Sequence, residues 1–280
     1  MDKPLAPGLH IVATPIGNLG DLSPRAAETL RGVDLILAED TRVTAKLLAH
    51  IGAKVRMARY DDHSSEAERD GIVARLGEQA IALVSDAGTP LISDPGYKLV
   101  RAARAAGHAV HTVPGPCAAI AALTLSGLPT DRFLFLGFLP AKAKARADAI
   151  GDIADIRATL VMYETGPRLA GTLTALEAGL GPRDAAVARE ITKLYEECVT
   201  GPLADLALRF ADADAPPKGE IVIVVAPPLE AEPASNTVID KLLDDALARL
   251  SPSRAAAEVA EQLNIPRKRV YARALERSGK

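Results

Sequence analysis

The segment Leu83–Gly96, LVSDAGTPLISDPG, combines a fixed acid with a turn rich in glycine and proline. The apolar run Ala80–Val84 predicts a buried strand that presents the carboxylate of Asp86 just beyond its end. In open parallel sheets, ligands bind in the crevice beyond the carboxyl ends of the strands. The segment therefore predicts a ligand site at Asp86, with capping of its own backbone as the alternative. Asp94 and Pro95 are expected to cap and begin the next helix.

Two further loops of this kind follow predicted strands. Pro15–Asp21 comes after the strand 9–14, and Pro114–Ala119 comes after the strand 109–113. Three such loops at one edge of a sheet could enclose a compact ligand with backbone groups and a single acid. The chain has no glycine-rich G-x-G after its first strand, no P-loop lysine, no nucleophile elbow and no cluster of metal ligands. Dinucleotide, hydrolase and metalloenzyme chemistry are therefore disfavoured.

Alternating strands and helices must position these loops. Besides the strand at 80–84 and the two just named, strands are predicted at 35–38 and 54–59, which favours a mostly parallel, helix-covered α/β sheet. A second α/β unit is predicted from about Thr130, with strands at 133–138, 159–163, 185–189 and 221–226. The predicted domains are 1–128 and 129–226, followed by a linker at 227–236 and a helical tail at 237–280.

The composition is that of a globular protein. Of 280 residues, 48% are hydrophobic and 25% charged, and the net charge of −3 gives no overall basic field for nucleic acid. Two cysteines without a CxxC pair fit a reducing compartment. There is no signal-peptide pattern and no apolar run long enough to span a bilayer. We therefore expect a cytoplasmic protein without a metal or a membrane partner.

The tail differs from the rest in charge. Thr237–Lys280 holds nine basic and six acidic residues, a net of +3 that leaves −6 on the rest of the chain. Helices are predicted at 238–250, 254–263 and 267–277, a helix-turn-helix pattern typical of nucleic-acid binding. The predicted contacts on the last helix are Arg267, Lys268, Arg269 and Arg273. A solvated basic helix or a dimer contact is the alternative.

Taken together, the motifs resemble a known family. ATPIGNLGDLSPRA (13–26), AEDTR (38–42), SDAGTPLISDPG (85–96) and VPGPCA (113–118) are similar to those of the bacterial 16S ribosomal RNA cytidine 2′-O-methyltransferases. That family lies in the tetrapyrrole-methylase superfamily of S-adenosyl-L-methionine (SAM) enzymes. The later segments YET (163–165), REITK (189–193) and GEI (219–221) fit as well, so the resemblance runs over about residues 9–226, and the tail is similar too.

The resemblance implies two α/β domains with SAM in the cleft between them, usually in a homodimer. It also implies 16S rRNA, within the small ribosomal subunit, as the partner. Small-molecule members of the superfamily carry a G-x-G-P-G type of first loop. Here Ala13–Gly17 takes its place, which favours the RNA branch.

The resemblance also assigns site residues. The positions that match its cofactor site are Pro15, Asp86, Gly88, Thr89, Ile92, Cys117, Ala118, Met162 and Tyr163. Nothing near Cys117 would lower its thiol pKa for nucleophilic use, so a small residue in a tight turn is the favoured interpretation. For Met162 and Tyr163, contact with the adenosine and plain core packing are both open.

Methyl transfer from a sulfonium mainly requires alignment of donor and acceptor, and a ribose hydroxyl benefits from a base. Glu39, Asp40 and Arg42 supply acids and a guanidinium at a predicted strand end and are the catalytic candidates. Arg189 and Lys193 are predicted to contact RNA. Either group could instead be a helix cap with a solvated ion pair. The five histidines lie outside the motif cores, so none is assigned as a base.

Two competing functions remain open. A SAM enzyme acting on a tetrapyrrole would have no use for a basic tail, and the first loop argues against it. A DNA-binding regulator that senses SAM would bind duplex DNA and transfer no methyl group.

Overall fold

In the computed structural model, the described residues are 5–211, 216–229, 236–263 and 265–278. The chain forms two compact units, Met1–Pro228 and Leu229–Lys280, and we describe each by itself. The first unit contains two five-stranded sheets, and the second contains three helices. The predicted linker at 227–236 falls largely on residues 230–235, outside the described residues. The predicted division at 128/129 stays a prediction.

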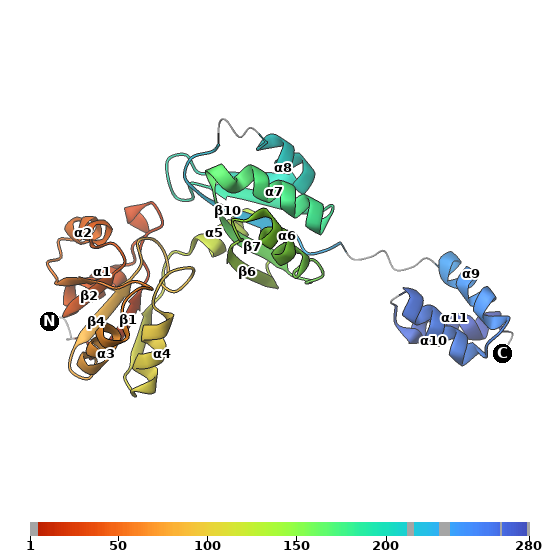
Figure 1. Ribbon diagram of the computed structural model, residues 1–280, viewed down its shortest axis with the longest axis horizontal. Coiled ribbons are helices and arrows are strands. Elements are labelled where there is room, and N and C mark those ends of the chain that lie inside the picture. Colours follow the sequence, from red (N-terminus) through yellow and green to blue (C-terminus); the bar gives the residue numbers. More distant parts are fainter. Residues whose placement is uncertain (1–4, 212–215, 230–235, 264, 279–280) are drawn as a thin grey trace. The chain divides into compact units, whose positions relative to one another are not determined.

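The first sheet is parallel throughout, as predicted. Its strands are ordered β3-β2-β4-β1-β5, and Figure 1 labels the central three, β2, β4 and β1. Their bounds are β1 Gly8–Val12, β2 Leu35–Ala38, β3 Met57–Arg59, β4 Ala80–Val84 and β5 Val110–Val113. Every residue of β2 and β4 is buried, since helices cover both faces of a parallel sheet and its central strands are apolar on both sides. The predicted ranges of these two strands are confirmed.

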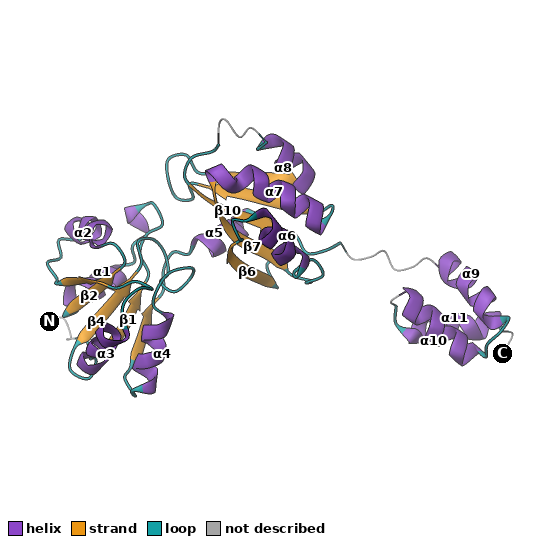
Figure 2. Ribbon diagram, viewed as in Figure 1, coloured by secondary structure: helices purple, strands orange, loops and turns teal. Residues whose placement is uncertain are grey.

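Helices cover this sheet (Figure 2), and their ends follow local capping rules. They are η1 Leu19–Asp21, α1 Pro24–Gly32, α2 Thr41–His50, α3 Glu66–Arg75 and α4 Tyr97–Ala105. Ser23 caps α1 through a bond from the Ala26 N–H, and Ser65 with Glu68 forms a capping box on α3. The prediction that Asp94 caps α4 is wrong. The helix begins two residues later because Gly96, with φ of 132°, supplies the turn that precedes it.

The strand order opens a crevice at the carboxyl edge of this sheet. β2 and β4 are neighbours, but the chain leaves β2 toward β3 and leaves β4 toward β5, in opposite directions along the sheet. The loops after these two strands therefore diverge, which is the arrangement at which open α/β sheets bind ligands. These loops carry Glu39–Arg42 and Asp86–Gly96.

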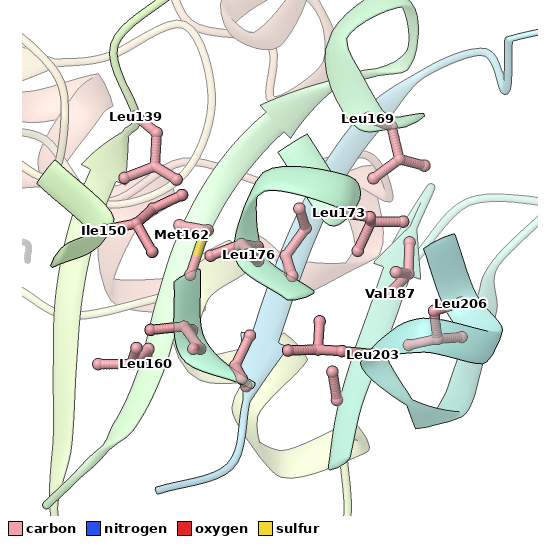
Figure 3. Close-up of a cluster of buried hydrophobic side chains, with 14 of the residues drawn as sticks. Leu139, Ile150, Leu160, Met162, Leu169, Leu173, Leu176, Val187, Leu203 and Leu206 are labelled. Atoms are coloured by element: carbon pink, nitrogen blue, oxygen red, sulfur yellow. The ribbon is translucent and has the colours of Figure 1, made fainter. Parts of the chain in front are cut away.

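The second sheet is mixed, with the order β6-β7-β10-β8-β9. Only β6 (Phe133–Phe138) and β7 (Thr159–Thr165) pair in parallel, whereas β10 (Glu220–Val225), β8 (Asp184–Arg189) and β9 (Glu197–Pro202) pair antiparallel. On one face lie α6 (Ala143–Gly151), α7 (Gly166–Leu180) and α8 (Leu203–Arg209); Ile150 of α6 and leucines of α7 and α8 pack with strand residues in one core cluster (Figure 3).

The helix α5 (Ala118–Leu125) covers the other face of the second sheet. It follows β5 of the first sheet, yet its Ala119, Ala122 and Leu123 pack with Val161 of β7 and Val224 of β10. The loop before α5 is therefore held between the two sheets, because its two ends are fixed in different cores. That loop is one of the three predicted to form the site.

The second unit is a helical domain of α9 (Asn236–Leu247), α10 (Pro252–Leu263) and α11 (Arg267–Arg277), packed on a small apolar core. Ion pairs connect its first and last helices: Arg273 pairs with Asp240, and Arg277 pairs with Asp244 at 2.5 Å. The sequence assigns Arg273 to nucleic-acid contact. The structure instead gives its guanidinium two carboxylate partners, Asp240 and Glu276, within the domain.

Candidate functional site

A cavity of about 370 Å³, here called the central cavity, lies at the carboxyl end of β4. Residues of both sheets line it. Among the predicted site residues, those lining it are Glu39, Asp86, Gly88, Thr89, Ile92, Ala118 and Tyr163. The remaining lining residues include Ile16 from the first loop, Ser93 and Asp94 from the loop after β4, Phe138 of β6, and Gly219–Val222 at the start of β10.

Backbone hydrogen bonds connect the three predicted loops. The N–H of Thr14 donates to the Gly88 carbonyl at 2.9 Å, and the Gly88 N–H donates back to Thr14 at 3.1 Å. The Thr89 hydroxyl donates to the carbonyl of Pro116 at 2.9 Å. Gly88 has φ of 82°, and a Cβ there would lie 3.1 Å from the Ile16 side chain. The site therefore needs glycine at this position both for the turn and for the close approach of the first loop.

Asp86 ties two strand ends together. Its Oδ1 accepts a hydrogen bond of 3.0 Å from the backbone N–H of Asp40, which follows β2. This hydrogen bond does not fit the alternative that Asp86 caps only its own backbone, because the donor, Asp40, follows a different strand, β2. One carboxylate oxygen thus holds the crevice between β2 and β4 in shape, and the side chain remains exposed at the cavity.

The central cavity is strongly acidic. Its described lining includes Glu39, Asp86, Asp94, Glu164 and Glu220 and contains no lysine or arginine. Burial raises the pKa of Asp94 to about 6, against the opposing effect of a hydrogen bond with Ser85, and the nearby carboxylates of Glu39 and Asp86 add to the rise. Burial and repulsion from Asp86 likewise raise the pKa of Glu39. Such a lining suits a ligand with a positive charge and hydroxyl groups, and it disfavours a phosphate.

Backbone strain is concentrated around this site. In the described chain, four residues other than glycine have positive φ: Leu91 (73°) and Ser93 (64°) after β4, and Glu190 (51°) and Thr192 (68°) after β8. Such conformations are unfavourable for residues with a Cβ and persist only where surrounding contacts impose them. Both loops carry residues that line a cavity, which is where this kind of strain tends to occur.

Tyr163 and Met162 lie on opposite faces of β7. The Tyr163 ring lines the central cavity and packs edge-on against Phe135 and Phe138, with centroids 5.0 and 5.6 Å away. Met162 is fully buried among the leucines of α7 (Figure 3). Side chains alternate along a strand, so only one of the two could face a ligand. A side-chain contact from Met162 is therefore corrected to core packing.

Two further predicted cofactor residues do not line the central cavity. Pro15 lines a neighbouring cavity, and Cys117 packs beside Tyr163 and Ala118 as the N-cap residue of α5. This position fits the interpretation of Cys117 as a small residue in a tight turn.

The catalytic candidates differ from one another in environment. The Asp40 side chain caps α2 through the N–H of Arg42 at 2.8 Å and also pairs with the Arg42 guanidinium. These bonds from Arg42 lower the pKa of Asp40 to about 2, so Asp40 is a weak base. Arg42 is 87% exposed. Glu39, with its raised pKa and its place in the central cavity, is the better proton acceptor of the three.

The predicted RNA contacts of the second sheet are both engaged with carboxylates. Arg189 pairs with Glu197 on β9 at 2.6 Å. Lys193 Nζ lies 2.9 Å from both Glu190 and Glu220. Partial burial lowers the pKa of Lys193, but these two hydrogen bonds outweigh it and raise the pKa overall. Lys193 therefore stays charged beside Glu220, the first residue of β10.

Gly219 gives a direct test of this cluster. It has φ of 96°, and a Cβ would lie 2.0 Å from Glu190 Oε1. Gly219→Ala is expected to destabilise the protein by about 1–3 kcal/mol for the backbone conformation and by about 1–3 kcal/mol more for the clash. Gly181→Ala is the control, because Gly181 also has positive φ but open space around it. Urea unfolding of both variants measures the difference, and equal losses would contradict the clash.

Among the lining residues that the sequence analysis did not assign to the site are two buried or half-buried acids, Asp94 and Glu164. Asp94 was assigned to a helix cap that the structure does not form. Glu164 is 2% exposed, and it accepts from the Thr172 hydroxyl at 2.6 Å and lies 3.2 Å from Arg168 Nε. The signal was present in both cases: each acid belongs to a motif that resembles the family and lies within two residues of one already assigned to the site.

Within the described residues, no group of three or more His, Cys, Asp or Glu side chains could hold a metal ion. No described helix has both the length and the apolar character needed to cross a membrane.

Comparison with known proteins agrees with this fold. The sequence profile of the Tetrapyrrole (Corrin/Porphyrin) Methylases matches residues 8–207, and that of the RsmI C-terminal HTH domain matches residues 233–278. Among solved structures, diphthine synthase superposes with a TM-score of 0.60 at 16% identity, covering 78% of this chain and 89% of that one. Uroporphyrin-III-C-methyltransferase from Thermus thermophilus gives 0.55 at 22% identity, covering 77% and 93%. These likenesses concern the fold alone.

Curated relatives match nearly the whole chain. Ribosomal RNA small subunit methyltransferase I from Erythrobacter litoralis is 56% identical over 98% of this chain and 96% of its own. The protein of that name from Escherichia coli O157:H7 is 46% identical over 97% and 96%. The chain therefore belongs to the tetrapyrrole methylase family and, within it, to the group of ribosomal RNA small subunit methyltransferase I proteins.

Proposed function

We propose that this protein is a SAM-dependent methyltransferase that methylates the ribose 2′-oxygen of a cytidine in the decoding region of 16S rRNA. The observation that carries the use of SAM is the acidic central cavity at the end of β4, without a basic side chain in its described lining. The relatives' name, ribosomal RNA small subunit methyltransferase I, supports the RNA substrate.

The residues present fit SAM. The carboxylates of Asp86 and Asp94 offer acceptors for hydroxyl and amino groups and a favourable potential for a cation. Ile16, Ile92 and Tyr163 offer apolar surface for an aromatic ring system. These residues would hold the donor, with Gly88 and Ala118 allowing the backbone to approach closely. When bound, SAM supplies a methyl group on a sulfonium sulfur, which leaves as a neutral thioether.

The chain's own contribution is alignment and proton transfer. Asp86 and its bond from Asp40 hold the crevice open at a fixed width, so that donor and acceptor meet in a defined geometry. Glu39 accepts the proton of the ribose hydroxyl, because its pKa is raised whereas that of Asp40 is lowered, so its carboxylate is the more basic of the two. Asp40 positions Arg42 rather than accepting a proton.

The test is transfer of label from tritiated SAM. The acceptors are small ribosomal subunits, free ribosomal RNA, a tetrapyrrole and duplex DNA, and the labelled nucleoside is identified after digestion. We expect label only in RNA, as 2′-O-methylcytidine. Label in the tetrapyrrole would support the small-molecule alternative, and DNA binding without transfer would support the regulator. Homodimer formation stays a prediction of the resemblance.

The tail gives a second test of the RNA substrate. Lys268 and its neighbours Arg267 and Arg269 begin α11, and Arg267 bonds to Ser253 of α10 at 2.9 Å, which leaves part of its guanidinium for a phosphate. Truncation after Ala234 removes this group while the first unit still binds SAM. Affinity for RNA should fall broadly across sequences, and the slope of log affinity against log salt should flatten by about 2 for three lost phosphate contacts.

The measurement is binding of small subunits at several salt concentrations. The triple variant R267A/K268A/R269A should reproduce the effect of the truncation, whereas R254A serves as a single-charge control on α10. Equal salt slopes for the full-length and truncated proteins would assign the tail to another partner.

A further inference from the structure

A second cavity, here called the lateral cavity, adjoins the central cavity. Its volume is about 340 Å³. Both cavities are lined by Ile16, Asp86, Ala87 and Glu220, so the loop after β4 forms a wall common to the two. No role assigned above uses the lateral cavity.

The walls of the lateral cavity are apolar on one side. Val43 and Leu47 come from α2, and Leu19 comes from the short helix η1. Leu19 is 45% exposed and Val43 is 37% exposed, which is unfavourable for aliphatic side chains unless something covers them. Val43, Lys46 and Leu47 are spaced i, i+3 and i+4, so one face of α2 presents the apolar wall and a lysine together.

The lateral cavity differs from the central cavity in carrying basic side chains. Lys46 and Lys193 line it beside the acids Asp86 and Glu220, whereas the described lining of the central cavity has acids and no basic side chain. Lys193 is held in place by Glu190 and Glu220. Lys46 is exposed and enters no ion pair with any described residue. A ligand with an apolar face and a negative group suits this lining, and a cationic donor does not.

We propose that the lateral cavity receives the nucleotide of the RNA that is methylated, an inference that rests on the proposed function. The base lies against Leu19 and Val43, the ribose faces the wall at Asp86 and Ala87 that borders the central cavity, and Lys46 and Lys193 bind the flanking phosphates. A base that has left its stack is recognised by packing against side chains, and the phosphates fix its register. Donor and acceptor would thus meet where the two cavities adjoin, at residues that line both, with Glu39 reaching the ribose from the side of the central cavity.

The experiment fills the lateral cavity without altering the central one. Val43→Phe places a ring in the lateral cavity, and Ala45→Phe on the same helix is its control, because Ala45 is exposed and lines neither cavity. Lys46→Ala removes one lysine from the lateral cavity. Lys54→Ala is its control, because Lys54 is also exposed but does not line the cavity. Each variant is measured for SAM affinity by calorimetry and for kcat/KM of methyl transfer to small subunits.

We expect Val43→Phe to lower kcat/KM at least about tenfold, about 1.4 kcal/mol, while SAM affinity stays within about twofold of wild type. Lys46→Ala should lower kcat/KM at low salt and reduce the salt slope of RNA binding by about 1. Both controls should behave as wild type. Loss of SAM affinity in Val43→Phe would assign the lateral cavity to the donor and overturn the inference. Equal activity of Val43→Phe and Ala45→Phe, with an active wild type, would overturn the inference alone. A wild type without transfer to RNA would overturn the proposed function.

Discussion

Replacing Asp86 by alanine is expected to weaken SAM binding by about 1.5–3 kcal/mol, the range for a hydrogen bond to a charged group. The loss has two sources. The variant removes an acceptor from the central cavity, and it also frees the Asp40 N–H that holds the end of β2 against the end of β4. The fold should survive, since Asp86 is an exposed loop residue. Calorimetry with SAM measures the affinity.

Asp86→Asn separates these two sources. Its amide oxygen still accepts from Asp40, so the shape of the crevice is kept while the negative charge is lost. We expect Asp86→Asn to retain the melting temperature of the wild type and still bind SAM weakly. Asp62→Ala, which removes a nearby acid that does not line the central cavity, is the control for net charge. Wild-type affinity in Asp86→Ala would remove this residue from the site.

Glu39→Gln is expected to lower kcat by about 10²–10⁴, the usual range for loss of a general base, with SAM affinity within about twofold of wild type. Glutamine has the same shape but cannot accept the hydroxyl proton. Single-turnover transfer to small subunits measures the chemical step, and calorimetry measures SAM. A parallel fall in binding and transfer would show that Glu39 serves to bind the donor and not to accept the proton.

The pH profile gives a second readout for Glu39. Its base form is the carboxylate, which exists above the pKa, and burial and the charge of Asp86 raise that pKa. The rate of methyl transfer should therefore rise with pH through the raised pKa of Glu39 and then level off. This rising limb of the pH profile should be absent in Glu39→Gln. Asp94 has a pKa of about 6 and is the competing source of such a limb. Asp94→Asn should keep the limb if Glu39 is the base.

The elements of the first sheet could be predicted because each strand has a clear apolar pattern. LILA and AIALV, at β2 and β4, are continuous apolar runs bounded by polar residues, so their ranges follow from the sequence. The edge strand β9 was missed. Its residues Glu197–Pro202, ECVTGP, pair with β8 at the edge of the sheet and none of them is buried, so they carry little hydrophobic signal. The antiparallel pairs of the second sheet also escaped prediction, because strand order depends on long-range contacts.

The site was predictable at the level of loops and less so at the level of side chains. The loops after β1, β4 and β5 do meet, through the bonds of Gly88 with Thr14 and of Thr89 with Pro116, since the ends of parallel strands share one edge of the sheet. Met162 and Tyr163 show where the reasoning stopped short: alternation along β7 allows only one of them to face the cavity, and a period of two was the signal to use. The bond from Asp40 to Asp86 joins residues 46 positions apart and could not be foreseen.

The positive φ angles of Leu91, Ser93, Glu190 and Thr192 have a consequence for the evolution of thermal tolerance. Each is a position where glycine would relieve backbone strain, so a search for more stable variants should select changes at these four residues early. All four lie in the loops that shape the two cavities, where relief of strain also loosens the geometry. Variants selected for heat resistance through these four positions are therefore expected to have a lower kcat. They gain stability of the folded chain, but the loops that line the cavities lose their preorganised geometry.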